Sequence, residues 1–122
     1  MKQDYIYTKK ISISSNQTIE TILEISGDAD FILKNITTSI VSGYENNIFL
    51  KFSDSGTSRD FMNDFISVAN LCPDSPALFN LILPKPQKLS KGTYLKITIK
   101  YINPNPVNIS FQLSFIGYKI YY

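Results

Sequence analysis

Apolar and polar side chains alternate strictly near the C-terminus, and this pattern constrains the fold more than any other feature of the sequence. Within residues 93–102, Leu95, Ile97, Ile99 and Tyr101 alternate with Lys96, Thr98 and Lys100, and the alternation resumes over residues 107–115. A side-chain period of two residues is typical of a β-strand with one buried face and one solvated face. The turn-forming segment Asn103-Pro104-Asn105-Pro106 separates the two strands, so we expect them to pair as an antiparallel hairpin.

The apolar positions change parity at Phe115-Ile116-Gly117. Beyond this point, Ile116, Tyr118, Ile120 and Tyr122 continue the alternation on the opposite face. Two interpretations stay open. A β-bulge at Gly117 would re-aim the strand, because one extra residue exchanges its two faces. Alternatively, the last residues are apolar on both faces because a neighbouring element or subunit covers them.

Further strand patterns occur along the rest of the chain. They cover residues 5–14, 19–25, 31–41, 48–52 and 77–83, and the third of them changes phase near Asn35. The segment Pro84-Lys85-Pro86 is excluded from a central strand, because prolines lack a main-chain N–H donor. These patterns predict seven or eight strands. The expected fold class is therefore all-β, a single antiparallel β-sandwich of the jelly-roll kind.

The length of the chain predicts one domain. A chain of 122 residues can bury one core but not two. We therefore expect residues 1–122 to form a single β-sandwich domain, with an extended arm over residues 1–10 left open. Residues 53–83 are the irregular part, and Arg59 to Ile66 within it is either one helical turn or a crossing strand. A long aromatic loop of this kind is where a sandwich places its contacts with partners.

The charge pattern argues against nucleic acid and membrane as partners. The formal net charge is +2, and eleven lysines and the single Arg59 are scattered among ten carboxylates. Nucleic-acid binders concentrate their basic residues on one face or in one arm. The sequence has no apolar run of the roughly 20 residues that a membrane helix needs, and we expect no secretory leader. The lone Cys72 cannot form an internal disulfide, so stability must come from packing.

The residue inventory argues against catalysis. The sequence contains no histidine, which removes serine–histidine and cysteine–histidine catalysis and histidine-ligated metals together. Its glycines are isolated, so a phosphate-binding loop is absent. Asp28 and Asp30 flank a turn that could hold calcium, but they lack the further oxygen ligands of a calcium loop, and we interpret them as turn carboxylates. We expect no enzymatic activity, no cofactor and no metal.

The aromatic residues supply the remaining material for a binding site. Those on alternating strand faces are expected in the core: Phe31, Phe52, Phe111 and Phe115. Those at turns, in the irregular segment or at polar positions are candidates for an exposed contact surface: Tyr44, Phe49, Phe61, Phe65 and Tyr94. An exposed aromatic surface on a sandwich suits a carbohydrate or another ligand, and the absence of tryptophan weakens that interpretation.

Four short motifs follow one another in the second part of the chain. They are Asp54-Ser55-Gly56-Thr57-Ser58-Arg59-Asp60-Phe61-Met62-Asn63, Leu81-Ile82-Leu83-Pro84-Lys85-Pro86, Gly92-Thr93-Tyr94-Leu95-Lys96-Ile97-Thr98-Ile99 and Phe111-Gln112-Leu113-Ser114-Phe115-Ile116-Gly117-Tyr118-Lys119. Because these motifs follow one another in this order, residues 52–122 resemble small structural proteins of tailed-bacteriophage virions, of the capsid-auxiliary or decoration type. The resemblance covers a little over half of the chain and does not extend to the first half.

The resemblance implies a β-sandwich subunit that coats or stabilises a capsid, or lies at a vertex or connector. The leading hypothesis is therefore a non-enzymatic virion structural protein, assembled in the host cytoplasm, that contacts other virion proteins and forms a homo-oligomer. The alternative is a carbohydrate- or ligand-binding sandwich at the tip of a fibre or adhesin. The residues predicted to form the interface are Arg59, Phe61, Met62, Phe65, Leu71, Tyr118, Tyr121 and Tyr122.

Overall fold

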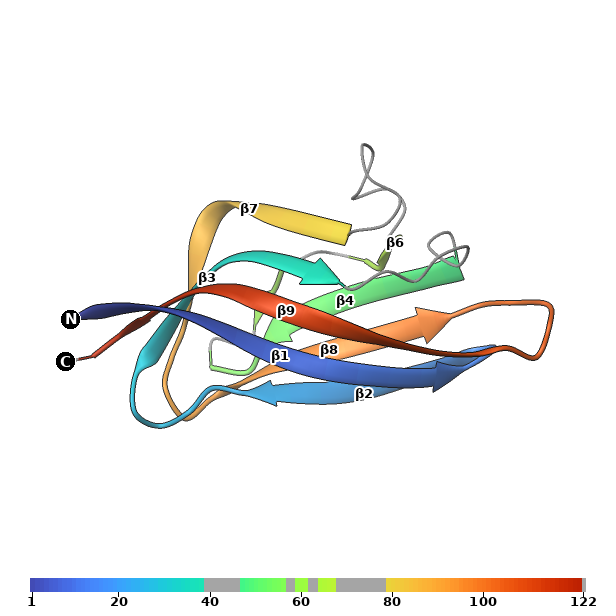
Figure 1. The fold of residues 1–122 in the computed structure, drawn as a ribbon, viewed down its shortest axis with the longest axis horizontal. Helices are drawn as coiled ribbons and strands as arrows, with labels where there is room; N and C mark the ends of the chain where they lie inside the picture. Colours follow the sequence, from blue (N-terminus) through green and yellow to red (C-terminus); the bar gives the residue numbers. More distant parts are fainter. Residues whose placement is uncertain (39–46, 57–58, 62–63, 68–78, 122) are drawn as a thin grey trace.

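The computed structural model of the chain describes residues 1–38, 47–56, 59–61, 64–67 and 79–121 (Figure 1). These residues contain nine strands: β1 (Lys2–Ser14), β2 (Gln17–Glu24), β3 (Asp30–Thr38), β4 (Ile48–Asp54), β5 (Arg59–Asp60), β6 (Ile66–Ser67), β7 (Phe79–Leu89), β8 (Tyr94–Tyr101) and β9 (Asn108–Ile120). Seven of the strands have seven or more residues, and β5 and β6 have two each. Within the described residues, no helix has the length and apolar character needed to cross a bilayer.

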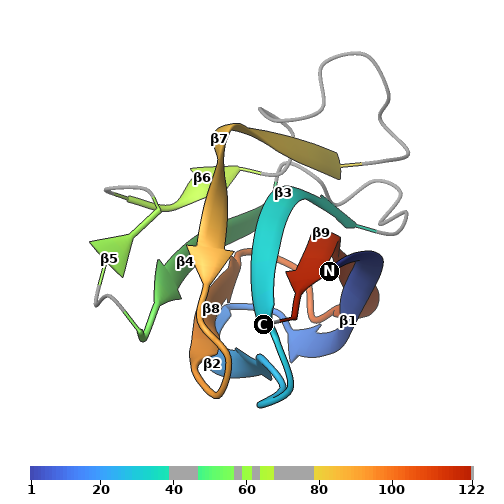
Figure 2. The ribbon, with the colours of Figure 1, turned by 90° about the vertical axis from the view of Figure 1, so that its left-hand side faces the viewer.

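The strands form two antiparallel sheets that pack as layers (Figure 2). One sheet has the order β1-β9-β3-β7, and the other has the order β2-β8-β4-β5, with β6 also paired to β4. The pairing is nested: the first strand pairs with the last, the second with the next to last, and so on inward to β4 with β5 and β6. This nested order is that of a jelly roll, which confirms the predicted all-β sandwich.

The core lies between the two sheets, and alternate residues of β1, β3, β4, β8 and β9 supply most of its described side chains. On β4 and β8, the side chains that point inward are buried and their neighbours are half-buried or exposed, as a period of two requires. The phenylalanines expected in the core, Phe31, Phe52, Phe111 and Phe115, are all buried. The rings of Phe52 and Phe115 meet edge to face across the sheets, with their centroids 6.1 Å apart.

The predicted hairpin of the two C-terminal strands is wrong. Strand β8 pairs with β2 and β4, whereas β9 pairs with β1 and β3 in the other sheet. The β1–β2 turn holds the connection between them, since Ser15 Oγ lies 2.7 Å from the carbonyls of both Asn105 and Val107 and accepts a hydrogen bond from the N–H of Val107 at 2.6 Å. Because β2 and β4 occupy both sides of β8, no edge of β8 is left for β9, and the connection crosses from one sheet to the other.

The interpretation that places a β-bulge at Gly117 is also wrong. The register between β1 and β9 is continuous along all of β9, and inward positions alternate without interruption as far as Lys119. The irregularity lies in β3, where pairing with β9 shifts between Leu33 and Asn35. This confirms the change of phase predicted near Asn35. A Cβ at position 117 would overlap the main-chain carbonyl of Ile32, so the close approach of β3 requires glycine there.

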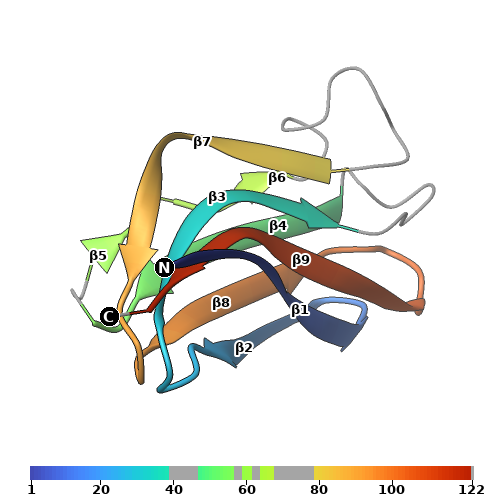
Figure 3. The same ribbon diagram turned by 60° about the vertical axis from the view of Figure 1, so that its left-hand side comes forward.

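Strand β7 lies at the edge of its sheet and bends sharply (Figure 3). Its pairing with β3 passes from Gln87 directly to Ile82, so the segment with Pro84 and Pro86 is not paired with β3. This agrees with the exclusion of these prolines from a central strand. At the other edge, β1 begins at Lys2 and pairs with β9 throughout, so residues 2–10 belong to the sheet.

Candidate interaction surface

Apolar side chains gather on the outer face of the four-stranded sheet. Because β9 keeps one register, its even-numbered residues point away from the core. Five residues on this face form what we call the outer apolar patch: Ile6, Ile32, Ile116, Tyr118 and Ile120. Ile6 pairs with Ile116 on one side of β9, and Ile32 pairs with Tyr118 on the other. Ile6 is 55% exposed, and the other four residues are half-buried.

Polar residues border the outer apolar patch. The ammonium of Lys2 lies 5.1 Å from the centre of the Tyr118 ring, a cation–π contact at the margin of the patch. Ile6 and Ile116 of the patch line a groove of about 570 Å³, together with the charged residues Asp4 and Lys34. Protein-binding surfaces commonly combine an apolar centre with a polar rim. The patch and its margin have this arrangement.

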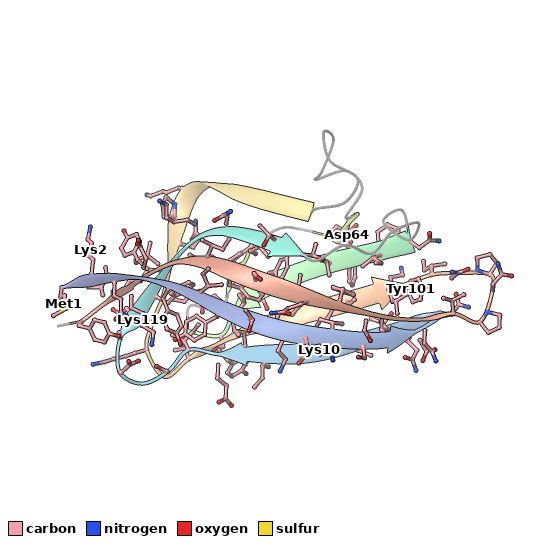
Figure 4. The ribbon with its side chains drawn as sticks, viewed as in Figure 1. Met1, Lys2, Lys10, Asp64, Tyr101 and Lys119 are labelled. Atoms are coloured by element: carbon pink, nitrogen blue, oxygen red, sulfur yellow. The ribbon has the colours of Figure 1, made fainter. Side chains whose placement is uncertain are left out.

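A lysine is buried at the end of the sandwich that carries the N-terminus. Lys119 occupies an inward position near the end of β9 (Figure 4). Its side chain is only 6% exposed. Its ammonium lies 3.3 Å from Oδ2 of Asp28 and 4.0 Å from the centre of the Tyr5 ring. The ammonium also lies 5.7 Å from the centre of the Tyr7 ring. The Tyr7 ring in turn packs edge to face against Phe31, with 4.9 Å between the ring centroids. The lysine therefore joins the aromatic end of the core to the β2–β3 connection.

The surroundings of Asp28 and Lys119 favour the charged form of each side chain. Burial disfavours the ammonium of Lys119, but the hydrogen bond to Asp28 and the nearby charges outweigh burial, so the pKa of Lys119 is raised. The hydrogen bond from Ser26 lowers the pKa of Asp28, although partial desolvation opposes it, and Lys119 lowers it further. A lysine that is protonated at neutral pH is not a nucleophile. The arrangement is a structural ion pair.

The second turn carboxylate also has basic partners. Oδ2 of Asp30 lies 3.5 Å from the ammonium of Lys88, and Oδ1 accepts a hydrogen bond from the main-chain N–H of Lys91 at 2.9 Å. Asp28 and Asp30 therefore each face a lysine and tie the β2–β3 connection to neighbouring strands. In the described part of the chain, no group of three or more potential metal ligands occurs.

The residues predicted to form one interface lie on two different sheets. Tyr118 belongs to the outer apolar patch, and Tyr121 lies just beyond β9, where its hydroxyl is 3.2 Å from Oε1 of Gln3. Arg59 lies in β5, opposite Asp54. Met62, Leu71 and Tyr122 lie outside the described residues.

The two predicted phenylalanines lie next to short strands of the five-stranded sheet, Phe61 directly after β5 and Phe65 directly before β6. Phe61 is half-buried against the core, and its N–H donates to the carbonyl of Phe52 at 3.0 Å. Phe65 is half-buried beside Lys100, whose ammonium is 5.7 Å from the ring centre. The structure thus brings Tyr118 and Tyr121 to one sheet, and Arg59, Phe61 and Phe65 to the other.

The remaining aromatic candidates differ in exposure. Tyr94 is 43% exposed at the start of β8, and Phe49 is half-buried on the outer face of β4. Tyr44 lies outside the described residues. In the described part of the chain, Tyr94 is therefore the most exposed of the aromatic side chains predicted at a contact surface.

Sequence reasoning did not select the isoleucines of the outer apolar patch. Ile116 and Ile120 carried a signal, because their parity opposes that of Phe115 and the earlier apolar residues of β9. Once the register is known to be continuous, opposite parity means an apolar outer face. Ile6 and Ile32 join them only through pairing with residues more than 80 positions away, and local periodicity carries no such information.

Solved structures similar to this chain share its fold. A chain of the capsid asymmetric unit of cyanophage Pam1 has a TM-score of 0.53 and 12% identity, and the match covers 96% of this chain and 86% of that one. FlhE has a TM-score of 0.51 and 4% identity, with 98% of both chains covered. A serine protease of Aeromonas sobria has a TM-score of 0.51 and 6% identity over 96% of this chain and 27% of the protease. No protein-family model matches the sequence, and no curated protein sequence does so.

Proposed function

We propose that this chain is a non-enzymatic virion structural protein, a capsid-auxiliary or decorating subunit, or one associated with a vertex or connector. One observation carries the proposal. The jelly-roll sandwich is similar along nearly its whole length to a chain of a phage capsid, and the match covers most of that chain as well. The similarity therefore extends over 86% of that capsid chain and is not confined to one part of a much larger protein. Jelly rolls are frequent among viral capsid domains, and this argument is an analogy of fold.

The outer apolar patch supports a role in protein–protein contact. Exposed apolar surface bordered by charged residues is a common feature of protein-binding sites. Here the patch lies on paired strands of the sheet and is flanked by Lys2, Asp4 and Lys34. Placing the patch against a shell protein would remove apolar surface from water, which stabilises an assembly.

Co-purification with particles tests the proposal. Virus particles from the source culture are purified on a density gradient and probed with antibodies against the chain. We expect the chain in the particle fraction at a fixed ratio to the shell protein. Particles stripped of the chain should lose thermal stability, and adding the purified chain back should restore it. A chain that is found only outside the particle fraction contradicts the proposal.

The same material tests the carbohydrate-binding alternative. Jelly rolls also occur in lectins, and Tyr94 provides one exposed ring on β8. If the chain binds a glycan array, is absent from particles, and loses glycan binding on Tyr94→Ala, the alternative replaces the virion role.

A further inference from the structure

Strand β1 forms a long open edge of the four-stranded sheet. In the described part of the chain, β9 is the only strand that pairs with β1, and β2, which follows β1, belongs to the other sheet. The edge is 13 residues long and has no break in register. Such an edge offers main-chain N–H and C=O groups to another strand. The opposite edge, β7, is interrupted by Pro84 and Pro86, which lack N–H donors.

The even-numbered residues of β1 carry the main-chain groups of the open edge. The N–H of Tyr121 donates to the carbonyl of Met1 at 3.0 Å, and the ammonium of Met1 donates to the carbonyl of Tyr121 at 3.3 Å. Hydrogen-bonded and non-hydrogen-bonded pairs alternate along an antiparallel ladder. The main-chain N–H and C=O groups of odd residues of β1 therefore bond to β9, and those of even residues point away from β9. Ser14 follows this rule, because its N–H donates to the side chain of Gln17.

We infer that two copies of the chain pair through β1 in antiparallel orientation, with a two-fold axis at Tyr7, so that their four-stranded sheets join into one. Charge selects this register. It places Asp4 of each copy directly opposite Lys10 of the second copy, and both side chains are exposed. A register centred on Ile6 would instead place Lys2 opposite Lys10, and like charges in that position repel.

The register also satisfies the hydrogen-bonding geometry. It pairs even residues with even residues, so each pair can exchange two N–H···O=C bonds. Ile6 lies opposite Thr8, next to the axis, and Lys2 lies opposite Ser12. A register centred on Thr8 would place Ile6 opposite Lys10 and would leave Asp4 opposite Ser12. The Tyr7 register therefore pairs the charges and keeps the apolar side chain away from a lysine.

Pairing in this register brings the outer apolar patches of the two copies together. Ile6 of each copy lies beside the axis on the outer face, and Ile116 lies next to it on β9. The two patches then form one continuous apolar surface across the joined sheet. A surface with two-fold symmetry suits contact with a repeated partner.

Sedimentation equilibrium and amide exchange on the full chain test this inference. We expect a dimer at concentrations of about 0.1 mM, with a dissociation constant in the micromolar range. In the dimer, the main-chain amides of Asp4, Ile6, Thr8 and Lys10 should exchange slowly, and dilution to monomer should raise their exchange at least tenfold. The amides of Tyr5, Tyr7 and Lys9 should stay protected in both states. A monomer at about 1 mM, or a dimer with fast exchange at the even positions, overturns the inference.

Charge reversal tests the register itself. Asp4→Lys should weaken association about tenfold, because the change acts twice in a symmetric dimer. Combining Asp4→Lys with Lys10→Asp should restore association to within about threefold of the original. Glu24→Lys makes the same charge change at an exposed position of β2 and should leave association unchanged. If Asp4→Lys has no effect, or if the double variant does not recover, the register is wrong.

The inference stands apart from the virion role. Dimerisation is measured on the purified chain alone, and the virion role is measured by co-purification with particles. A monomeric chain found in particles overturns only the dimer, and a dimeric chain absent from particles overturns only the virion role.

Discussion

The ammonium of Lys119 lies 3.3 Å from Oδ2 of Asp28, so a cation on the inner face of β9 meets its carboxylate partner at the end of the core. The two groups differ in environment, because the Lys119 side chain is 6% exposed and that of Asp28 is 50% exposed. Loss of the carboxylate charge would leave a buried cation that has aromatic neighbours and no compensating negative charge. Loss of the lysine would leave a carboxylate that water can hydrate.

We predict that Asp28→Asn destabilises the fold at neutral pH more than Lys119→Met does, because only the first leaves a buried charge. The loss depends on pH. The lowered pKa of Asp28 contributes stability above its unfolded value of 3.8, and that contribution is lost as pH falls through the folded pKa. The raised pKa of Lys119 contributes stability below 10.5, and that contribution is lost as pH rises through the folded pKa.

Urea unfolding from pH 2 to pH 11 measures this prediction. The difference in unfolding free energy between the unsubstituted chain and Asp28→Asn should be greatest between pH 3.8 and pH 10.5. It should shrink below and above this range as one of the two groups loses its charge. Glu24→Gln, at an exposed position of β2, is the matched control and should show little difference at any pH. A difference that does not change between pH 2 and pH 7 would show that the ion pair is not its cause.

We predict that Gly117→Ala destabilises the fold by about 1–3 kcal/mol through overpacking. The added methyl group would overlap the carbonyl of Ile32 and lie 3.1 Å from Cζ of Phe31, and main chain cannot move aside as a flexible side chain can. Gly27→Ala is the control, since a Cβ at that position has no neighbour within 4 Å, and it should change stability by less than about 0.5 kcal/mol. Equal unfolding midpoints in urea for the two variants would refute this explanation.

We predict that the turn residue Asn16 tolerates glycine better than alanine. Its φ of 61° is left-handed, and its side chain exchanges two hydrogen bonds with the main chain of Asn103, at 2.9 and 3.2 Å. Both substitutions remove these bonds, but only alanine adds the steric cost of a left-handed conformation, so Asn16→Ala should be less stable than Asn16→Gly by about 1 kcal/mol. Thermal unfolding of the two variants gives the comparison, and the opposite order would contradict it.

We predict that Ile116→Lys weakens binding to the particle at least tenfold and costs about 1 kcal/mol of folding stability, because the side chain is half-buried. Ile116 lies on β9, away from the open edge of β1, so this variant tests the patch without changing the residues that face a second copy. Ile22→Lys is the control, since Ile22 is 39% exposed on β2 in the other sheet. Binding of labelled variants to stripped particles measures the effect. Equal loss with both variants would show that the patch is not the contact.

Local patterns in the sequence predicted the strands well and their partners poorly. The alternation around Leu95 and Ile97 indicated β8 correctly, and the change of phase near Asn35 indicated the irregularity in β3. The hairpin prediction failed because pairing depends on which strands occupy both edges of β8, and periodicity contains no information about them. Candidate interface residues were equally hard to group, since Phe65 and Tyr118 lie on different sheets.

The sequence alone determined that the chain is all-β, which faces of β4, β8 and the first part of β9 turn inward, and that Pro84 and Pro86 stand outside a central strand. Each of these follows from side-chain period or from a missing donor, which are properties of neighbouring residues. Only the tertiary structure decided that position 117 must be glycine because the main chain of Ile32 lies so close to it. It also decided that Lys119 is buried beside Asp28, and that Ile6 and Ile116 lie side by side on one outer face. These relations join residues far apart in the chain, and the nested pairing of the jelly roll creates them.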